Sequence, residues 1–173
     1  MFLTEWARQS LVDWCSVFRM NLIPQKNAKL LQCRRILESY RVLTGETLLP
    51  YEGDLEAAAQ ALFSAPFVVV AHGTECDPVL NYGNAMALRL WEMEWSEFTQ
   101  TPSRFTAEAP EREERARLLS EVTKNGFIRN YSGVRISKTG VRFRIQRATV
   151  WNLFDEDGSI HGQAATFVHW ERV

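Results

Sequence analysis

The sequence predicts one α+β domain in which helices cover one face of an antiparallel sheet. Two short apolar segments, PFVVVAH and PVLNYGN, are typical of strands and are followed by several short helical segments. From Phe127 onward, three further segments alternate apolar and polar side chains and are separated by turn residues. Two strands, then helices, then three antiparallel strands is an α+β order.

The composition is that of an ordinary globular domain. The chain has 173 residues, 46% hydrophobic and 24% charged, so we expect an ordered chain with a real core. Its formal net charge is −1 and its pI is near 6.3. A whole-protein attraction to nucleic acid or to an anionic membrane is therefore not expected, and neither is predicted as a partner.

Cysteine usage and the N-terminus favour a cytoplasmic protein. The cysteines are Cys15, Cys33 and Cys76, an odd number without a C-x-x-C pair, which is typical of free thiols in a reducing compartment. The N-terminus carries Glu5 and Asp13 and lacks the basic start and apolar run of a signal peptide. The longest apolar run, around PFVVVA, is too short to span a bilayer.

Residues 1–50 are predicted to form a helical extension that packs on the domain or joins two copies of it. Large side chains in segment 6–18 are spaced roughly for one helix face: Trp6, Trp14 and Phe18. In segment 28–45, apolar side chains recur at i, i+3, i+7 and i+10: Leu30, Cys33, Leu37 and Tyr40. Gly45 is well placed to end this helix, which is too short to form a coiled coil by itself.

Helix-capping residues mark the next elements. Asp54 is expected to cap a helix over DLEAAAQALF, which ends before the strand PFVVVAH. Asn84 is expected to cap a helix over NAMALRLWEMEW, after the strand PVLNYGN. A short helix through PSRFT and a longer one from Pro110 to Asn125 follow, and Gly126 ends the latter.

The three final strands are expected over FIRNYSGVRIS, VRFRIQRATVWNLF and IHGQAATFVHW, with SKTG and DEDG as turns. In VRFRI, alternation puts Phe143 and Ile145 on the helix-covered face and the arginines on the other. This basic face is either a solvated surface, which we favour, or a docking surface for an acidic partner. A surface for single-stranded nucleic acid is the third and least favoured interpretation, because the pI near 6.3 argues against it. The candidate partner-face residues are Arg129, Arg135, Arg142 and Arg144.

Long blocks of the chain resemble the MEKHLA domain family. They include FVVVAHGTECDPVLNYGNAMALRLWEMEW, GFIRNYSGVRISKTGVRFRIQRATVWNL and DEDGSIHGQAATF, within about Phe67 to Phe167. The resemblance implies a PAS-like fold for residues 51–173: a five-stranded antiparallel sheet with helices between its second and third strands. It implies no particular function, because PAS folds host flavin, haem, small-molecule and protein-binding roles.

Recognisable catalytic motifs are absent, so an enzyme is not expected. The chain has no G-x-S-x-G, P-loop, G-x-G-x-x-G or H-E-x-x-H. PAS relatives that form a flavin–thiol adduct use an Asn-Cys-Arg-Phe run. The local analogue here is PSRF, which lacks a cysteine, and this disfavours the adduct but leaves non-covalent flavin open. Haem or metal is not expected, because His72, Cys76, His161 and His169 show no established ligand spacing.

A small organic ligand in the space between sheet and helices is favoured over haem or metal. The candidate lining residues are Tyr82, Trp91, Arg104, Phe105, Tyr131, Phe143, Trp151 and Gln163. For each aromatic side chain, simple core filling is the alternative interpretation. Arg104 and Gln163, if buried, need hydrogen-bond partners.

These features suggest a sensory or regulatory module that acts through protein association, with or without a small ligand. A homodimer and a separate signalling protein are the expected partners. The alternative is a carrier or cofactor-dependent catalyst that uses the internal pocket, and a third interpretation is a structural dimerisation module with a filled core.

Overall fold

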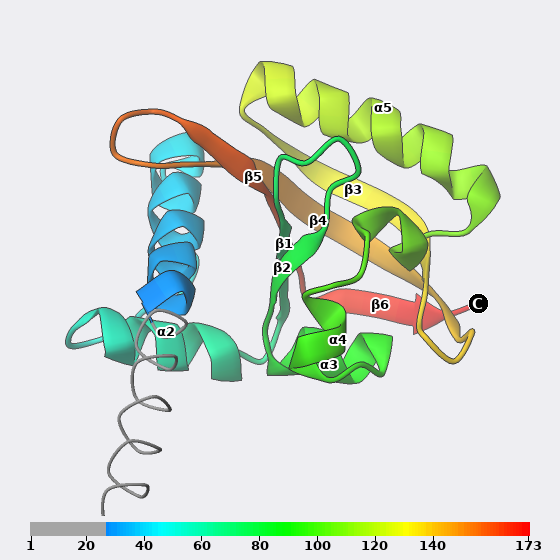
Figure 1. Ribbon diagram of the computed structural model, residues 1–173, viewed down its shortest axis with the longest axis horizontal. Helices are drawn as coiled ribbons and strands as arrows, with labels where there is room; N and C mark the ends of the chain where they lie inside the picture. Colours follow the sequence, from blue (N-terminus) through cyan, green and yellow to red (C-terminus); the bar gives the residue numbers. More distant parts are fainter. Residues whose placement is uncertain (1–26) are drawn as a thin grey trace, which may run out of the picture.

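The computed structural model describes residues 27–173, which are built around one antiparallel sheet (Figure 1). The strand order is β2–β1–β5–β4–β3, and β6 also pairs with β4. The strands are β1 Val68–His72, β2 Leu80–Gly83, β3 Phe127–Ile136, β4 Arg142–Phe154, β5 Ile160–Phe167 and β6 His169–Arg172. The helices are a helix at 27–44, α2 Leu55–Ser64, α3 Ala85–Trp91, α4 Trp95–Phe98, the 3-10 helix η1 Ser103–Thr106, and α5 Ala109–Asn125. The helix predicted for segment 6–18, with Trp6, Trp14, Phe18 and Cys15, lies outside the described residues.

The sheet confirms the predicted order of two strands, helices and three strands, with one addition. The last predicted strand is divided at Val168 into β5 and β6. β5 pairs with residues 149–154 of β4, and β6 pairs with residues 143–146 of the same strand. The long strand β4 therefore has two successive neighbours along one edge.

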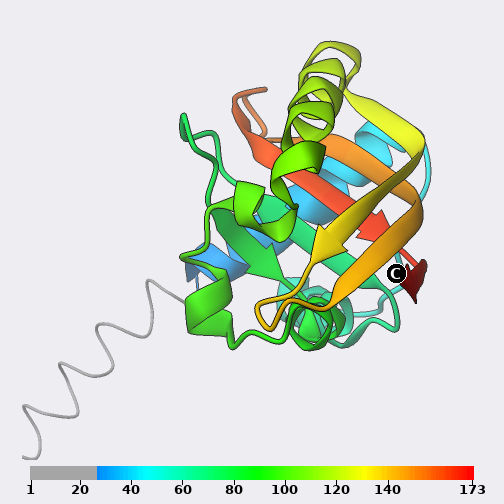
Figure 2. The same ribbon diagram turned by 90° about the vertical axis from the view of Figure 1, so that its right-hand side faces the viewer.

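Helices cover both faces of the sheet, as the two views in Figures 1 and 2 show. Helix 27–44 and α2 lie against one face, called the outer face, while α3, α4 and α5 lie against the other, the inner face. Helices were predicted on one face only, with the N-terminal extension left free to pack or to dimerise. In the structure, helix 27–44 packs against its own domain, with Ile36 and Leu37 buried in the outer core.

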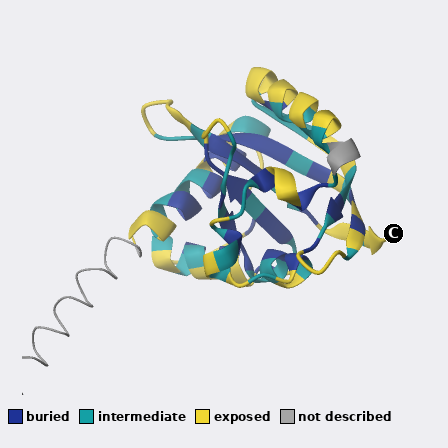
Figure 3. Cartoon of the chain, turned by 45° about the vertical axis from the view of Figure 1, so that its right-hand side comes forward, coloured by how far each residue is buried: buried dark blue, intermediate teal, exposed yellow. Residues whose placement is uncertain are grey.

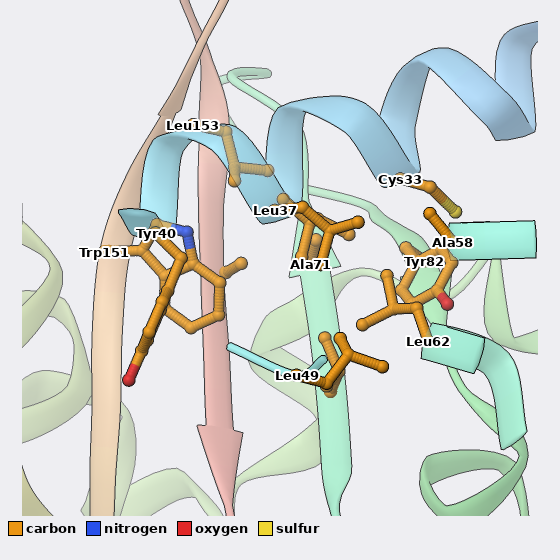
Figure 4. Packing of buried hydrophobic residues seen from close by; sticks show 13 residues of the cluster. Cys33, Leu37, Tyr40, Leu49, Ala58, Leu62, Ala71, Tyr82, Trp151 and Leu153 are labelled. Atoms are coloured by element: carbon orange, nitrogen blue, oxygen red, sulfur yellow. The ribbon is translucent and has the colours of Figure 1, made fainter. Parts of the chain in front are cut away.

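The outer core is formed mainly by buried apolar side chains, ten of which are labelled in Figure 4. Trp151 of β4 is fully buried and meets the Tyr40 ring edge-on, with 5.0 Å between ring centroids. Ile36 and Leu62 are also fully buried in this cluster. Burial of this apolar area makes helix 27–44 an integral part of the fold.

The inner core is centred on Trp91 of α3. Its ring meets those of Phe143, Phe98 and Phe167 edge-on, at centroid distances of 5.2, 6.1 and 6.3 Å. Phe143 and Ile145 are buried here while Arg142 and Arg144 are exposed, so the predicted alternation at the start of β4 is confirmed. Figure 3 shows that α5 exposes much of its surface, in contrast to the buried strands beneath it.

A bulge in β4 at Arg147 reverses which residues face each core. Arg147 has a φ of 50°, and the pairing with β3 shifts register between Tyr131 and Gly133. Before the bulge, Ile145 belongs to the inner core. After it, Trp151 belongs to the outer core, although both have odd numbers and would share a face in a regular strand.

The predicted caps are present, and one helix end is corrected. The carboxylate of Asp54 accepts from the Ala57 N–H at 3.0 Å, and Asn84 Oδ1 accepts from the Ala87 N–H at 3.1 Å. The helix capped by Asn84 was predicted to continue through Trp95. It ends at Trp91 because Glu92 adopts the left-handed conformation, with φ 58°, and a separate short helix α4 follows.

Candidate functional site

A cavity of about 60 Å³ lies on the inner face of the sheet, beneath α5. Its wall is largely apolar, as is usual for ligand sites. The apolar lining includes Val70 on β1, Ile145 and Val150 on β4, and Leu118 and Leu119 on α5. Because both leucines are only half-buried, α5 is the side on which the cavity lies nearest to solvent.

His72, the last residue of β1, lines the cavity with an uncharged ring. It is 8% exposed, and its Nδ1 lies 2.9 Å from the Gly73 carbonyl oxygen. Since a carbonyl oxygen only accepts, Nδ1 carries the proton, and Nε2 is an acceptor without a partner among the described residues. Burial lowers the pKa of His72 to about 4, so the ring is neutral at physiological pH. Gly162 of β5 passes so close that a Cβ there would overlap the His72 carbonyl oxygen.

Gln163 lies opposite His72 in the sheet and ties β5 to α5. Its side-chain nitrogen is 3.0 Å from the Leu119 carbonyl oxygen, 3.0 Å from Asn152 Oδ1 and 3.1 Å from the Thr123 hydroxyl. These acceptors determine the orientation of the amide. They leave Gln163 Oε1 buried with no partner in the described part of the chain.

Two arginines face the cavity, Arg115 from α5 and Arg135 from β3. Arg135 is 6% exposed and donates to the Tyr131 hydroxyl at 2.9 Å and to the Val134 carbonyl oxygen at 2.8 Å. Among the carboxylates whose side chains the structure describes, in residues 27–108 and 112–173, none lies within ion-pair distance of either guanidinium. Burial, together with the positive charge of Arg135, lowers the pKa of Arg115 to about 10. The cavity therefore holds positive charge that these carboxylates do not neutralise.

Trp91 adds an unused donor to the cavity wall. Its Nε1–H is buried and has no partner within the described residues. Together with His72 Nε2 and Gln163 Oε1, it leaves buried polar atoms on three elements without a hydrogen bond. An unpaired buried polar atom is destabilising, so this wall suits a polar guest better than a hydrocarbon.

The predicted pocket residues separate into four groups. Trp91, Tyr131 and Gln163 line the cavity. Phe143 is buried beside Trp91, with ring centroids 5.2 Å apart, but is not part of the cavity lining.

Tyr82 and Trp151, which were predicted to line the pocket, lie in the outer core instead. For Trp151 the reason is the bulge at Arg147. For Tyr82 it is a register shift between β1 and β2, which sends Leu80 to the inner core and Tyr82 to the outer one.

Arg104 and Phe105, also predicted to line the pocket, lie at the surface. Arg104 forms an ion pair with Asp77, and its guanidinium lies 4.4 Å from the centre of the Phe105 ring. Phe105 is 49% exposed. This arrangement joins η1 to the loop after β1, outside the cavity.

The four predicted partner-face arginines do not share one surface. Arg129 pairs with Glu46 at 3.0 Å, and Arg142 pairs with Glu108 at 2.9 Å. Arg144 is exposed, without an ion pair to the carboxylates described here. Arg135 belongs to the cavity, because it lies opposite Phe143 in the sheet and opposite residues project to the same face.

Arg115 was not among the predicted site residues, although the sequence carries a signal for it. Leu118 and Leu119 line the cavity, and residues three and four apart share one helix face. Arg115 precedes them by that spacing, so the helical period of these leucines is the signal that could have identified it. For Arg135, only the pairing of β3 with β4 reveals the orientation.

Neither flavin nor metal fits the described residues well. The cavity of about 60 Å³ is far below the roughly 300 Å³ or more that drug-sized ligands occupy. Its lining contains no cysteine among the described residues: Cys33 lies in the outer core, where burial raises the pKa of its thiol to about 11, and Cys76 is exposed. Within residues 27–173, no three His, Cys, Asp or Glu side chains are grouped for a metal ion, and His161 instead contacts Asp155.

Solved structures place the chain in the PAS class of folds. It aligns with the PAS domain of a protein from Colwellia psychrerythraea with a TM-score of 0.59 and 13% identity, over 69% of this chain and 96% of that one. It aligns with a light-oxygen-voltage domain studied with a flavin analogue with a TM-score of 0.53 and 18% identity, over 66% and 83%. An RNA-binding light-oxygen-voltage receptor aligns with a TM-score of 0.54 and 17% identity, over 70% and 36%. The predicted PAS-like fold is thereby confirmed.

Sequence comparison assigns the chain more specifically than the fold does. The MEKHLA domain model matches residues 31–172, and the chain belongs to the MEKHLA domain family. The homeobox-leucine zipper protein ATHB-14 of Arabidopsis thaliana is 24% identical over 157 residues. That alignment covers 87% of this chain and 18% of the Arabidopsis protein. The match starts within helix 27–44, so the family includes most of the helix that covers the outer face.

Across residues 27–173, no helix combines the length and the apolar character that a bilayer span requires.

Proposed function

We propose that this chain is a sensory or regulatory module whose inner cavity binds a small ligand. The carrying observation is that buried atoms of His72, Trp91 and Gln163 on the cavity wall have no hydrogen-bond partner. A bound molecule that pairs with these atoms would relieve a destabilising state. One solved structure with the same fold is named an RNA-binding light-oxygen-voltage receptor, and this supports a sensory role.

Signal transfer would use α5. Gln163 lies on the cavity wall and donates to the Leu119 carbonyl oxygen of α5 at 3.0 Å. Arg115, Leu118 and Leu119 bring the same helix to the ligand. A ligand that contacts α5 in one of its positions stabilises that position, which is the differential affinity that a two-state response requires.

The binding part of the proposal is tested with a substitution that fills the cavity. Ala165 of β5 pairs with Val70 and Val150, and all three line the cavity, so Ala165→Leu should fill it. Ala59→Leu is the matched control, because Ala59 borders an open hollow of about 450 Å³ on the outer side. Ligand-observed NMR with a set of small polar molecules should detect binding to the wild type and to Ala59→Leu, but not to Ala165→Leu. Absence of binding to the wild type, or binding that survives Ala165→Leu, contradicts the proposal.

A carrier would use the same cavity without a response, and amide hydrogen exchange separates the two roles. A sensor should show changed protection along α5 when ligand binds, whereas a carrier should not. We propose no catalytic role. The cavity hydroxyl of Thr106 donates to the Ser103 carbonyl oxygen at 2.7 Å and is therefore not activated by His72.

Association with a second copy or a separate signalling protein is a further part of the proposal. The outer face of β4 near Arg144 is exposed next to β6, beyond the cover of helix 27–44. Arg144→Glu is the cleaner test, because Arg142→Glu would also break the ion pair with Glu108. Multi-angle light scattering should show a lower mass for Arg144→Glu than for the wild type. An unchanged dimer mass, or a wild type that is already monomeric, contradicts homodimerisation through this face.

A further inference from the structure

We infer that the cavity ligand is a small carboxylate that also carries a hydroxyl group, the class of glycolate and lactate. The inference rests on the proposed function, since it names the chemistry of a guest in the same cavity. It draws on the positive charge, the unused acceptors and the volume of the site.

The positive charge calls for an anion. Arg135 is 6% exposed and uses its N–H groups on two neutral oxygens, of Tyr131 and Val134. Arg115 lies near enough that its charge and that of Arg135 repel. No carboxylate of the described chain pairs with either one, so a bound anion would supply the missing counter-charge. A planar guanidinium matches the two oxygens of a carboxylate.

The unused acceptors call for a hydroxyl. His72 Nε2 and Gln163 Oε1 are buried acceptors on neighbouring strands, and the two residues lie opposite each other in the sheet. A carboxylate has no hydrogen to donate and cannot satisfy them. A hydroxyl donates one hydrogen bond, so it can pair with one of these two acceptors. It also accepts, so the Trp91 Nε1–H could be paired from the same guest.

The volume restricts the size of the guest. A cavity of about 60 Å³ has room for roughly four to six water-sized groups. Glycolate and lactate are of this size, whereas nucleotides, flavins and haem are much larger. Formate and acetate would fit as well, but they lack the hydroxyl that the acceptors require.

The class is tested with three probes on the full chain at constant ionic strength: lactate, propionate and 1,2-propanediol. Isothermal titration calorimetry should show lactate binding at least about ten-fold more tightly than propionate, which lacks the hydroxyl, since a buried site penalises the missing polar group. 1,2-Propanediol, which lacks the carboxylate, should bind at least about ten-fold more weakly than lactate.

Each outcome decides one part of the inference. Equal binding of propionate and lactate overturns the hydroxyl requirement, and equal binding of the diol overturns the carboxylate. In both cases a ligand still occupies the cavity, so the proposed function stands. No binding of lactate overturns the inference as a whole, while the Ala165→Leu experiment judges the proposed function separately.

The charge argument has a matched pair of variants on α5. Arg115→Gln removes a cavity cation from a half-buried position, and Arg117→Gln removes an exposed cation from the same helix. Lactate affinity should fall about 10- to 100-fold in Arg115→Gln and change little in Arg117→Gln. Equal losses in the two variants would show a general charge effect and overturn the role of Arg115. Because Arg115 is half-buried, its variant should remain folded, and circular dichroism checks this.

Discussion

The two faces of the sheet differ in how completely they are packed. On the outer face, helix 27–44 and α2 press apolar side chains such as Ile36 and Leu62 into contacts without solvent. On the inner face, α5 leaves a cavity lined by His72, Gln163 and two arginines. Buried polar atoms without a described partner occur on both faces, for example Trp151 Nε1 on the outer one and His72 Nε2 on the inner one. Only the inner atoms line the cavity beneath α5, which is why we place the proposed function there.

The largest loss of stability is expected for a substitution in the outer core. Trp151→Ala removes a fully buried indole that meets Tyr40 edge-on, and should lower the free energy of unfolding by about 3–5 kcal/mol. Urea denaturation followed by circular dichroism measures this. A near-neutral result would show that the outer core is loosely packed and would remove the contrast between the faces.

The next largest effect is the pH dependence of folding stability that is caused by His72 on the inner face. Burial lowers the pKa of His72 in the folded state to about 4, compared with about 6.5 for an exposed histidine. Between these values the unfolded state binds more protons. Stability is therefore complete above about pH 6.5 and should fall by about 3 kcal/mol as pH decreases to about 4.

The measurement is urea unfolding at several pH values between 4 and 7. His72→Gln should weaken this pH dependence, whereas His169→Gln, which changes an exposed histidine, should preserve it. Equal pH dependence in the wild type and in His72→Gln would show that other groups cause the acid sensitivity.

A pair of leucine substitutions compares the packing of the two faces directly through the stability that each one loses. Leu118→Ala removes a half-buried side chain beside an existing cavity, so the loss of stability should be only about 1 kcal/mol. Leu37→Ala on the outer face should cost about 2–5 kcal/mol, because Leu37 is buried in a filled core. Similar losses in these two variants, measured by urea denaturation, would contradict the difference in packing.

The smallest effect concerns how helix 27–44 is held at its edge. Arg35 donates to both carboxylate oxygens of Asp155, at 2.6 and 2.8 Å, and so links the helix to the turn after β4. The pair is partly exposed, so Arg35→Gln should lower the melting temperature less than any core variant does. Hydrogen exchange should localise the change to residues 27–44. A loss as large as that of Trp151→Ala would mean that the ion pair, rather than the apolar contacts, attaches the helix.

The sequence predicted the strands, the caps at Asp54 and Asn84, and the alternation at Phe143, because these follow from local periodicity and side-chain chemistry. It did not predict on which face Trp151 lies, because the bulge at Arg147 arises from pairing with strands that are distant in sequence. The inward position of Arg135 has the same origin.

Helix 27–44 illustrates a different limit. Its apolar stripe, which includes Leu37, was predicted correctly, but a stripe does not identify the surface that it covers. The candidate pocket residues were chosen by type, and only Trp91, Tyr131 and Gln163 reached the cavity.

The bulge in β4 also determines which genetic changes the strand can accept. Odd-numbered residues such as Ile145 belong to the inner core before Arg147, and odd-numbered residues such as Trp151 belong to the outer core after it. The number of residues in the strand therefore matters more for the fold than the identity of Arg147. Replacement of Arg147 by glycine or asparagine, which adopt its backbone conformation readily, should be tolerated. Loss or gain of one codon there would exchange the outer-core and inner-core side chains along half of the strand, so relatives should vary in residue type at this position but seldom in length.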